Sequence, residues 1–553
     1  MGLFRLLKRK LFGGAKSGES ARHKPESRQD SKKDEAVAAA SDLSSERPRP
    51  DSGEKNEEAG RTPASRILQK IRDAMGGSDD FLYHEFMVGG RVPCATVSIE
   101  HMIDDSTYRM EILEPLLVPG FVRTPEEIFR QVAERGQLPV AVTVADESAK
   151  VIDAILEGQV AFFVDGEERV MLFPIRQVEK RQIFEALNES VIRGPKEAFV
   201  EDIATNLTMI RRKIKTPALQ VKRLTFGRLT RTAVVVVYID TVCKPELVAE
   251  VKHRMSRIDI DGVLSANYIE EYIEDNPYSP FPQVIFTERP DSLAAALLEG
   301  RVGIIADGSP NPIIVPATFP MMMQSAEDYY QRYIATTWIR WIRFLFLIVS
   351  LLLPSLYIAV TTFHPEMMPP LLLTTVAASR ENVPFPAIVE ALIMEISFEG
   401  LREAGLRIPK TIGQTISIIG ALIIGQAAVQ AGLVSTPMVI VVSITGVASF
   451  IIPHYELGLS FRLLRFPVML LATTFGLFGI IIAVFLIYLH LVTLRSFGTP
   501  YMAPIAPLDR RDLKDVFVRV PWWKMMIRPH LFGTKNRQRL VPSGRPISGE
   551  EED

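Results

Sequence analysis

The most constraining feature of this sequence is a series of long uncharged apolar runs in its second half. Phe344–Phe363 has twenty residues without a charge, which is enough to cross the hydrocarbon core of a bilayer as a helix. Three more uncharged runs follow at Thr411–Ala431, Thr436–Ile452 and Pro467–Leu491. Soluble core helices rarely occur in such a series, and cleaved signal segments lie at the N-terminus. The sequence therefore predicts an α-helical integral membrane domain over residues 331–497.

An acid-rich segment interrupts these runs. Residues 384–410 have the sequence PFPAIVEALIMEISFEGLREAGLRIPK, which contains Glu390, Glu395, Glu399 and Glu403. On a helix that begins after the second proline, the last three acids lie along one side and Glu390 points roughly opposite Glu399. Each acid near the bilayer centre costs about 2.5–3.5 kcal/mol, whereas a large apolar residue returns about 0.3–0.6 kcal/mol. A lipid-facing span is excluded, which leaves a helix inside a bundle, a helix lining water or an interfacial helix.

Two interpretations of these acids remain. Glu399 and Glu403 each have an arginine at helical spacing, so surface ion pairs of small energetic value explain them. Glu390 and Glu395 have no base on their own helix face, and ionisable residues at membrane depth indicate an ion or substrate path. A ring of carboxylates, one set per subunit, selects cations. We predict Glu390 and Glu395 as a candidate ion path, with Glu399 as a weaker candidate.

The run Thr411–Ala431 carries the amides Gln414, Gln426 and Gln430. Amides in membrane helices commonly form hydrogen bonds between helices, so packing within one protomer explains them. Lining a polar path is the functional alternative. Gln414 and Gln426 are therefore weaker candidates for that path.

The basic residues around the runs do not fix the topology. Arg332, Arg340 and Arg343 precede the first run and predict that the soluble region before it is cytoplasmic. If the acidic helix crosses, there are five spans and the basic tail lies outside. If it does not cross, there are four spans and the basic loops lie outside. We predict four spans plus one acidic interfacial or re-entrant helix, with five spans as the alternative.

An internal repeat divides the region before the membrane domain. LEGQVAFFVDGEERVMLFP (Leu156–Pro174) matches LEGRVGIIADGSPNPIIVP (Leu298–Pro316) at an offset of 142 residues. Each copy predicts a helix followed by a β-hairpin. The Asp165-Gly166 and Asp307-Gly308 pairs are expected in the hairpin turns, and turn geometry explains them without a catalytic role.

The repeat predicts two related cytoplasmic α/β subdomains, at residues 63–190 and 191–330. The segment Pro195–Lys215 is expected to form a helix that joins them. The predicted fold class is thus an α/β soluble region of two related subdomains followed by an α-helical membrane domain.

The two ends of the chain differ from this body. Residues 1–12 predict either a basic amphipathic helix or a frayed basic terminus. Residues 13–62 lack large apolar side chains almost entirely and predict a disordered linker, because they cannot bury enough surface to offset their ordering entropy. Residues 498–553 form a basic C-terminal tail, since the last 59 residues hold eleven Lys and Arg.

Composition and motifs exclude several classes of protein. Cys94 and Cys243 are the two cysteines and form no CxxC pair, which favours a reducing compartment and argues against a disulfide scaffold or a structural zinc site. No HExxH, Walker A or GxSxG motif is present. A solute carrier would show more spans and an inverted repeat. We expect no enzyme, no cofactor, no metal site and no nucleic-acid partner.

Three stretches resemble the GerA spore-germination family. They are GPKEAFVEDIATNLTMIRRKIK at residues 194–215, NPYSPFPQVIFTERPD at Asn276–Asp291, and Phe363–Gly432, which includes the acidic segment. The resemblance extends from about residue 80 to residue 510 and leaves out the charged N-terminal segment and the end of the tail. Several long motifs in the same order make it specific.

This resemblance implies the A subunit of a nutrient germinant receptor of endospore-forming bacteria. Such a subunit lies in the spore inner membrane, with its N-terminal domains on the cytoplasmic, spore-core side. It works with a transporter-like B subunit and a lipoprotein C subunit. It is expected to form a homo-oligomer that opens as a nutrient-gated cation channel, and the resemblance assigns no ligand-binding residue.

A non-conducting membrane scaffold is the alternative. Such a scaffold would couple nutrient binding by a partner subunit to germination, and the acids would serve only in ion pairs. The nutrient, the number of subunits, the side of the tail and the entry point of the ligand signal stay open at this stage.

Overall fold

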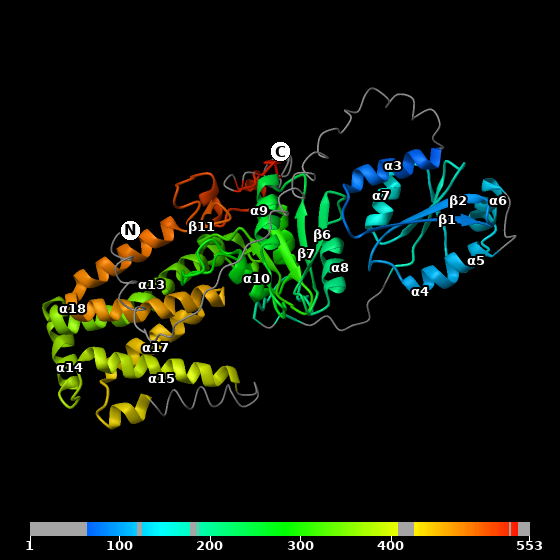
Figure 1. Ribbon diagram of the computed structural model, residues 1–553. Helices are drawn as coiled ribbons and strands as arrows, with labels where there is room; N and C mark the ends of the chain where they lie inside the picture. Colours follow the sequence, from blue (N-terminus) through cyan, green and yellow to red (C-terminus); the bar gives the residue numbers. More distant parts are fainter. Residues whose placement is uncertain are drawn as a thin grey trace, which may run out of the picture. The chain divides into compact units, whose positions relative to one another are not determined.

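The computed structural model describes residues 63–118, 124–176, 185–186, 188–407, 425–529, 532 and 534–539 (Figure 1). The predictions for residues 1–12 and 13–62 lie outside these residues. So do Gln414 and most of the predicted span Thr411–Ala431.

Subdomain 1 is an antiparallel sheet with helices on both faces. Its strands have the order β1-β2-β4-β5-β3, and Figure 1 shows α3 and α7 on one side and α4 and α5 on the other. Side chains alternate along β4, so Phe162 packs towards α5 and α6, whereas Phe163 packs towards α3 and α7. The elements are α3 (Pro63–Met75), β1 (Phe81–Val88), β2 (Val92–Ile99), α4 (Asp105–Thr107), the π-helical η2 (Tyr108–Leu113), α5 (Glu114–Leu117), α6 (Pro125–Phe129), the π-helical η3 (Arg130–Glu134), β3 (Thr143–Ala145), α7 (Ser148–Leu156), β4 (Val160–Val164) and β5 (Val170–Phe173).

Subdomain 2 repeats this design with the strand order β6-β7-β9-β10-β8. Val236 on β7 packs towards α9 and α10, whereas Val235 and Val237 pack towards α8 and α11. The elements are α8 (Ile203–Lys213), β6 (Leu219–Phe226), β7 (Thr232–Ile239), α9 (Pro245–Ser256), α10 (Ala266–Ile273), β8 (Ile285–Phe286), α11 (Pro290–Leu298), β9 (Val302–Ala306), β10 (Ile313–Val315), α12 (Phe319–Met322) and the 3-10 helix η4 (Ala326–Tyr329).

The equal strand orders agree with the repeat found in the sequence. The paired strands β4 and β5 enclose Asp165-Gly166, and β9 and β10 enclose Asp307-Gly308. Both glycines have a positive φ, 95° at Gly166 and 76° at Gly308, so both Asp-Gly pairs lie in turns as predicted.

The helix predicted at Pro195–Lys215 is shorter than expected. Helix α8 begins at Ile203, where the Asp202 side chain accepts a hydrogen bond from the Thr205 amide at 2.9 Å. The residues before it pair with other segments, since the Phe199 amide donates to the Glu288 carbonyl at 2.8 Å. This pairing holds the start of the segment in a non-helical conformation.

A buried ion pair joins the two subdomains. Arg211 on α8 donates to Asp80 through Nε at 2.7 Å and through Nη2 at 2.8 Å, and both residues are only 2% exposed. Asp80 lies just before β1 and also accepts a hydrogen bond from Ser78 Oγ at 2.7 Å. The bidentate geometry fixes the orientation of α8 against the first subdomain.

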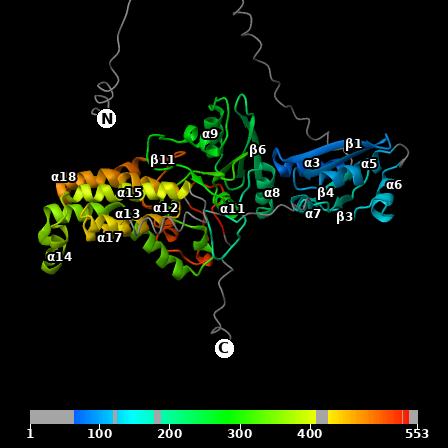
Figure 2. The same ribbon diagram turned by 90° about the horizontal axis from the view of Figure 1, so that it is seen from below.

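The helical domain follows, and Figure 2 shows α13, α15, α17 and α18 running alongside one another. Its elements are α13 (Tyr333–Phe363), the 3-10 helix η5 (Pro365–Met367), α14 (Pro370–Arg380), α15 (Ala387–Arg407), α17 (Thr436–Phe450) and α18 (Tyr455–Thr493). Among the described residues, α13 and α18 are long and apolar enough to cross a membrane, and α17 is a shorter apolar helix. The predicted count of four spans stays a prediction.

The predicted span Pro467–Leu491 is not one straight helix. A straight helix would separate Phe461 from His490 by about 43 Å at 1.5 Å per residue, but both rings lie close to Phe281, at centroid distances of 5.6 and 6.0 Å. The chain turns back at Gly476, whose φ of 58° favours glycine. Helix α18 is therefore two antiparallel arms, as Figure 1 shows in orange. An uncharged run does not reveal such a turn, because both arms are equally apolar.

The chain that follows α18, from Arg495 onward, forms a tail that begins slightly before the predicted residue 498 and packs against subdomain 2. Ser496 Oγ donates to the Gln283 carbonyl at 2.7 Å and accepts from the Ala317 amide at 2.9 Å. The Phe319 amide donates to the Tyr501 carbonyl at 2.8 Å. The described tail contains β11 (Arg495–Ser496), β12 (Thr499–Pro500) and the 3-10 helices η6 (Asp512–Asp515) and η7 (Trp522–Lys524).

The tail contacts subdomain 2, so both ends of the helical domain meet the same soluble subdomain. The number of spans, four or five, and the side of the membrane on which the tail lies stay predictions.

Candidate functional site

The acidic helix α15 begins directly after Pro386, as predicted from the sequence, and contacts α13, α17 and α18. Its acids do not share one environment. Three of them face neighbouring elements and one faces outward, and we describe them in chain order.

Glu390 is completely buried and has partners on two other elements. Its Oε1 accepts from Arg380 Nε, at the end of α14, at 3.2 Å. Its Oε2 accepts from the amide and the hydroxyl of Ser435, which precedes α17, at 2.8 and 2.7 Å. The carboxylate thus ties three segments together at one end of the helical domain.

Glu395 is 1% exposed and forms a buried ion pair with Arg465 on the first arm of α18. Arg465 Nε also donates to the Ser350 carbonyl on α13 at 2.9 Å. Among the described residues, Glu395 Oε1 and Arg465 Nη2 have no hydrogen-bond partner. This pair therefore joins three helices and still leaves buried polar atoms unsatisfied, which is costly at membrane depth.

Glu399 has two bases, and Glu403 has one. Arg462 on α18 donates to Glu399 through Nε at 3.0 Å, and Arg402 donates to it at 3.4 Å. Glu403 pairs with Arg407 at 2.6 Å on the exposed face. The predicted local pairs of Glu399 and Glu403 are present, but Glu399 has an additional partner from a distant helix.

The bases that pair with Glu390 and Glu395 were not predicted, because they come from other elements. Arg380 and Arg465 lie ten and 70 residues away along the chain. A signal was available, since Arg462 and Arg465 lie in the largely apolar stretch LSFRLLRFPVML and need counter-charges there. Gln426, the other candidate amide within the described chain, is exposed.

The paired acids hold α15 against its neighbours and leave no bare carboxylate among Glu390, Glu395 and Glu399. Removing one partner of such a buried pair costs about 3–5 kcal/mol, because the other charge stays buried. In the described part of the chain, no group of three His, Cys, Asp or Glu side chains is arranged to hold a metal ion.

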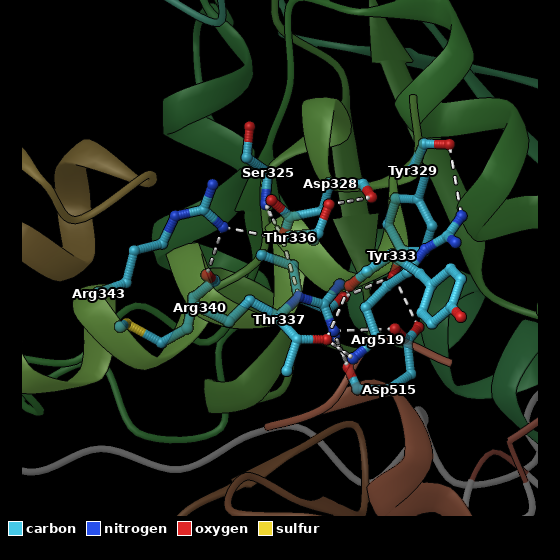
Figure 3. A network of polar contacts seen from close by, with 12 residues as sticks. Ser325, Asp328, Tyr329, Tyr333, Thr336, Thr337, Arg340, Arg343, Asp515 and Arg519 are labelled. Atoms are coloured by element: carbon cyan, nitrogen blue, oxygen red, sulfur yellow. Dashed lines mark hydrogen bonds and ion pairs between the residues drawn. The ribbon is translucent and has the colours of Figure 1, made fainter. Parts of the chain in front are cut away.

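A second polar network lies where the tail meets the start of α13 (Figure 3). Arg340, which is 1% exposed, donates to Asp328 Oδ2 and to Asp515 Oδ1, each at 2.9 Å. Arg343 donates to the same Asp328 oxygen at 2.8 Å. The Arg519 amide donates to Thr337 Oγ1 at 3.2 Å. The network connects subdomain 2, α13 and the tail.

An acid cluster lies between α10 and the first turn of α18. Glu270 on α10 and Glu274, which directly follows that helix, are near Glu456. Burial, followed by repulsion from Glu456 and Glu274, raises the pKa of Glu270 to about 8. The ordinary value is 4.5. Glu270 therefore binds a proton more tightly in the folded protein than in the unfolded chain.

This pKa predicts a pH dependence. Between about pH 4.5 and 8 the unfolded chain loses its proton first, so stability from this group falls as pH rises. Glu270→Gln is expected to raise the free energy of unfolding at about pH 8 by on the order of 1–2 kcal/mol and to leave it unchanged near pH 4. Thermal unfolding of the detergent-solubilised protein across this range measures the effect. The exposed acid Glu246 on α9 provides the control variant Glu246→Gln, and equal pH profiles for both variants would contradict the assignment.

The chain is similar in sequence to spore germination proteins. The family model "Bacillus/Clostridium GerA spore germination protein" matches residues 69–531. The uncharacterized membrane protein YfkQ of Bacillus subtilis (strain 168) is 45% identical over 473 residues, which cover 85% of this chain and 92% of that protein. Spore germination protein KA of the same organism is 40% identical over 485 residues, covering 87% and 89%.

One solved structure was also found among the similar proteins. The crystal structure of the N-terminal domain of the A subunit of the Bacillus megaterium spore germinant receptor GerK3 is 32% identical, with a TM-score of 0.37. It covers 47% of this chain and 96% of that chain. The family match over most of the sequence shows that this chain belongs to the GerA family of spore germination proteins.

Proposed function

We propose that this chain is the A subunit of a nutrient germinant receptor and that it oligomerises to conduct cations across the spore inner membrane. Membership of the family and the names of its relatives support the receptor assignment. The proposed assembly includes a transporter-like B subunit and a lipoprotein C subunit, with the soluble subdomains and the tail on the spore-core side. We propose no catalytic activity.

The observation that supports the conducting role is a series of three acids on α15, two buried and one half-buried, each paired with an arginine from another element. Arg380 covers Glu390, Arg465 covers Glu395 and Arg462 covers Glu399. Each guanidinium occupies the position that a permeating cation would take beside the carboxylate. Once the arginine has moved away, the free carboxylate can select cations. We propose that the paired arrangement is the closed state and that opening separates these pairs.

A non-conducting scaffold is the second candidate. The same pairs favour it, since fully paired acids explain helix packing without any ion path. In that case, replacing an acid and replacing its arginine should have the same effect, because the loss of either partner only weakens the packing of the helices.

The difference between acids and arginines gives the test. The full-length protein, reconstituted into liposomes with its partner subunits, is measured for cation flux and for cation-over-anion selectivity. If the acids line the path, Glu390→Gln and Glu395→Gln reduce selectivity several-fold, whereas Arg380→Gln and Arg465→Gln raise the basal cation leak. Glu403→Gln, on the exposed face, is the matched control and should behave like the wild type.

Two results would decide against the proposed path. Unchanged selectivity in both glutamate variants would remove the acids from it. A wild-type assembly that stays impermeable under every nutrient condition would favour the scaffold. Thermal unfolding of each variant separates a change in conduction from a loss of folded protein.

A further inference from the structure

A cavity of about 720 Å³ lies between the C-terminal tail and subdomain 2. Apolar side chains form part of its wall, among them Met321, Val516, Met525 and Phe532. It is separate from the acidic helix, because no residue of α15 lines it. Its size suits a ligand of several heavy atoms with both polar and apolar parts.

The charges around this cavity are unbalanced. Six basic side chains and three acids line it: Arg301, Arg511, Lys514, Lys524, Arg537 and Arg539, with Glu299, Asp512 and Asp515. The acids are already engaged. Glu299 lies 3.8 Å from Arg301 and 3.6 Å from Arg539, Asp515 pairs with Arg340, and Asp512 also has a partner.

Four of the bases have no such partner. None of the ion pairs between described residues includes Arg511, Lys514, Lys524 or Arg537. Four uncompensated cations around one cavity create a local positive potential that attracts an anion. The site therefore favours a multivalent, phosphate-like group.

Arg301 adds a fixed cation to the wall. It is 3% exposed, it donates from Nη1 to the Pro316 carbonyl at 2.6 Å, and its guanidinium lies 4.1 Å from the centroid of the Phe532 ring. Its buried Nε has no hydrogen-bond partner among the described residues, and Glu299 Oε2 lies 3.8 Å from it, beyond hydrogen-bond distance. This unsatisfied Nε–H group can donate to an acceptor from outside the chain, in competition with Glu299.

The tail that forms the cavity also lies beside the start of the first apolar span. The ring of Phe517 is 5.0 Å from that of Phe344, where the uncharged run begins, and Trp523 meets Tyr333 at 6.3 Å. Figure 3 shows Asp515, on the wall of the cavity, reaching Arg340 on α13. The cavity is thus near the level at which α13 leaves the hydrocarbon.

Exposed apolar side chains surround this level on both segments. On α13, Trp338 and Trp341 are 62% and 52% exposed. On the tail, the exposed residues are Phe517, Val518, Trp522, Trp523, Met526 and Ile527. Aromatic residues of this kind concentrate at the membrane–water interface, and basic pockets beside membrane helices on the cytoplasmic side bind anionic headgroups.

We propose that this cavity binds the phosphate headgroup of an anionic phospholipid and that the tail segment 514–527 rests on the leaflet facing the soluble domain. The four bases and Arg301 supply the charge, and the exposed aromatic residues contact the acyl-chain boundary. The inference requires membrane insertion of the helical domain and is independent of whether the protein conducts ions.

The experiment compares lipid binding by the full-length protein and a four-site variant. Arg511→Gln, Lys514→Gln, Lys524→Gln and Arg537→Gln are combined in that variant. A matched control combines Lys70→Gln, Arg109→Gln, Arg135→Gln and Lys244→Gln, which are exposed bases on other surfaces. The detergent-purified proteins are titrated with phosphatidylglycerol, phosphatidylcholine or inorganic phosphate. Thermal unfolding and native mass spectrometry report binding, and circular dichroism checks the fold.

We expect phosphatidylglycerol to stabilise the wild type and the control. Its apparent affinity should fall by roughly tenfold or more in the four-site variant, since each base near an anionic surface adds to the attraction. Phosphatidylcholine should have little effect. Equal losses in the variant and the control would overturn the site. Equal protection by inorganic phosphate would overturn the lipid as its source, and undiminished lipid binding by the four-site variant would overturn the proposal.

Discussion

Replacing Arg340 by methionine is expected to lower the free energy of unfolding of the full-length protein by about 3–5 kcal/mol. Arg340 donates to buried Asp328 and to Asp515, and the substitution leaves both carboxylates without this partner. The tail loses its principal polar contact with α13 at the same time. Thermal unfolding in detergent, together with the rate of protease cleavage in the tail, measures both consequences.

Arg343→Met is the control for this prediction. Arg343 pairs with Asp328 alone and is more exposed, at 12% of its side chain against 1% for Arg340. Its loss should therefore cost much less and should leave the tail resistant to protease. Equal effects of the two substitutions would show that the link to Asp515 contributes nothing to stability.

Asp80→Ala is expected to cost a similar amount, about 3–5 kcal/mol, because it leaves the guanidinium of Arg211 buried without a counter-charge. The double variant Asp80→Leu with Arg211→Met should regain much of the loss, since well-packed apolar residues often replace a buried pair at little cost. Chemical denaturation of the full-length protein gives the three free energies.

The neighbouring residue provides the matched comparison. Asp79 pairs with Lys222 at 2.8 Å, but both side chains are substantially exposed. Asp79→Ala should cost about 0–1 kcal/mol, as is usual for surface pairs. If Asp79→Ala and Asp80→Ala lower the free energy of unfolding equally, burial does not explain the contribution of the Asp80–Arg211 pair to stability.

Local sequence patterns predicted much of the soluble fold. The offset of 142 residues makes Val160, where β4 begins, equivalent to Val302, where β9 begins. Both Asp-Gly pairs lie in turns between paired strands. These features depend on neighbours in sequence. The predicted start of α8 was wrong because it depends on a residue distant in sequence. The backbone hydrogen bond from Phe199 to Glu288 overrides the helical preference of the residues before Ile203.

The candidate site was predicted only in part. Periodicity placed Glu395, Glu399 and Glu403 on one helix starting after Pro386, and α15 has that start. The ion pairs of these acids with other helices could not be predicted from the sequence, since helical spacing does not show which element lies beside Glu390 or Glu395. The turn at Gly476 was missed because hydropathy records how apolar a segment is and not its direction.

The tail's position has a consequence for how the protein is made. Gln283 and Ala317 leave the ribosome long before Ser496, and the whole helical domain is synthesised between them. One surface of subdomain 2 therefore stays uncovered until the helices have entered the membrane and the last part of the chain has emerged. The tail can cover that surface only when the whole preceding chain has been synthesised. A truncated product therefore leaves an apolar face accessible to chaperones and proteases.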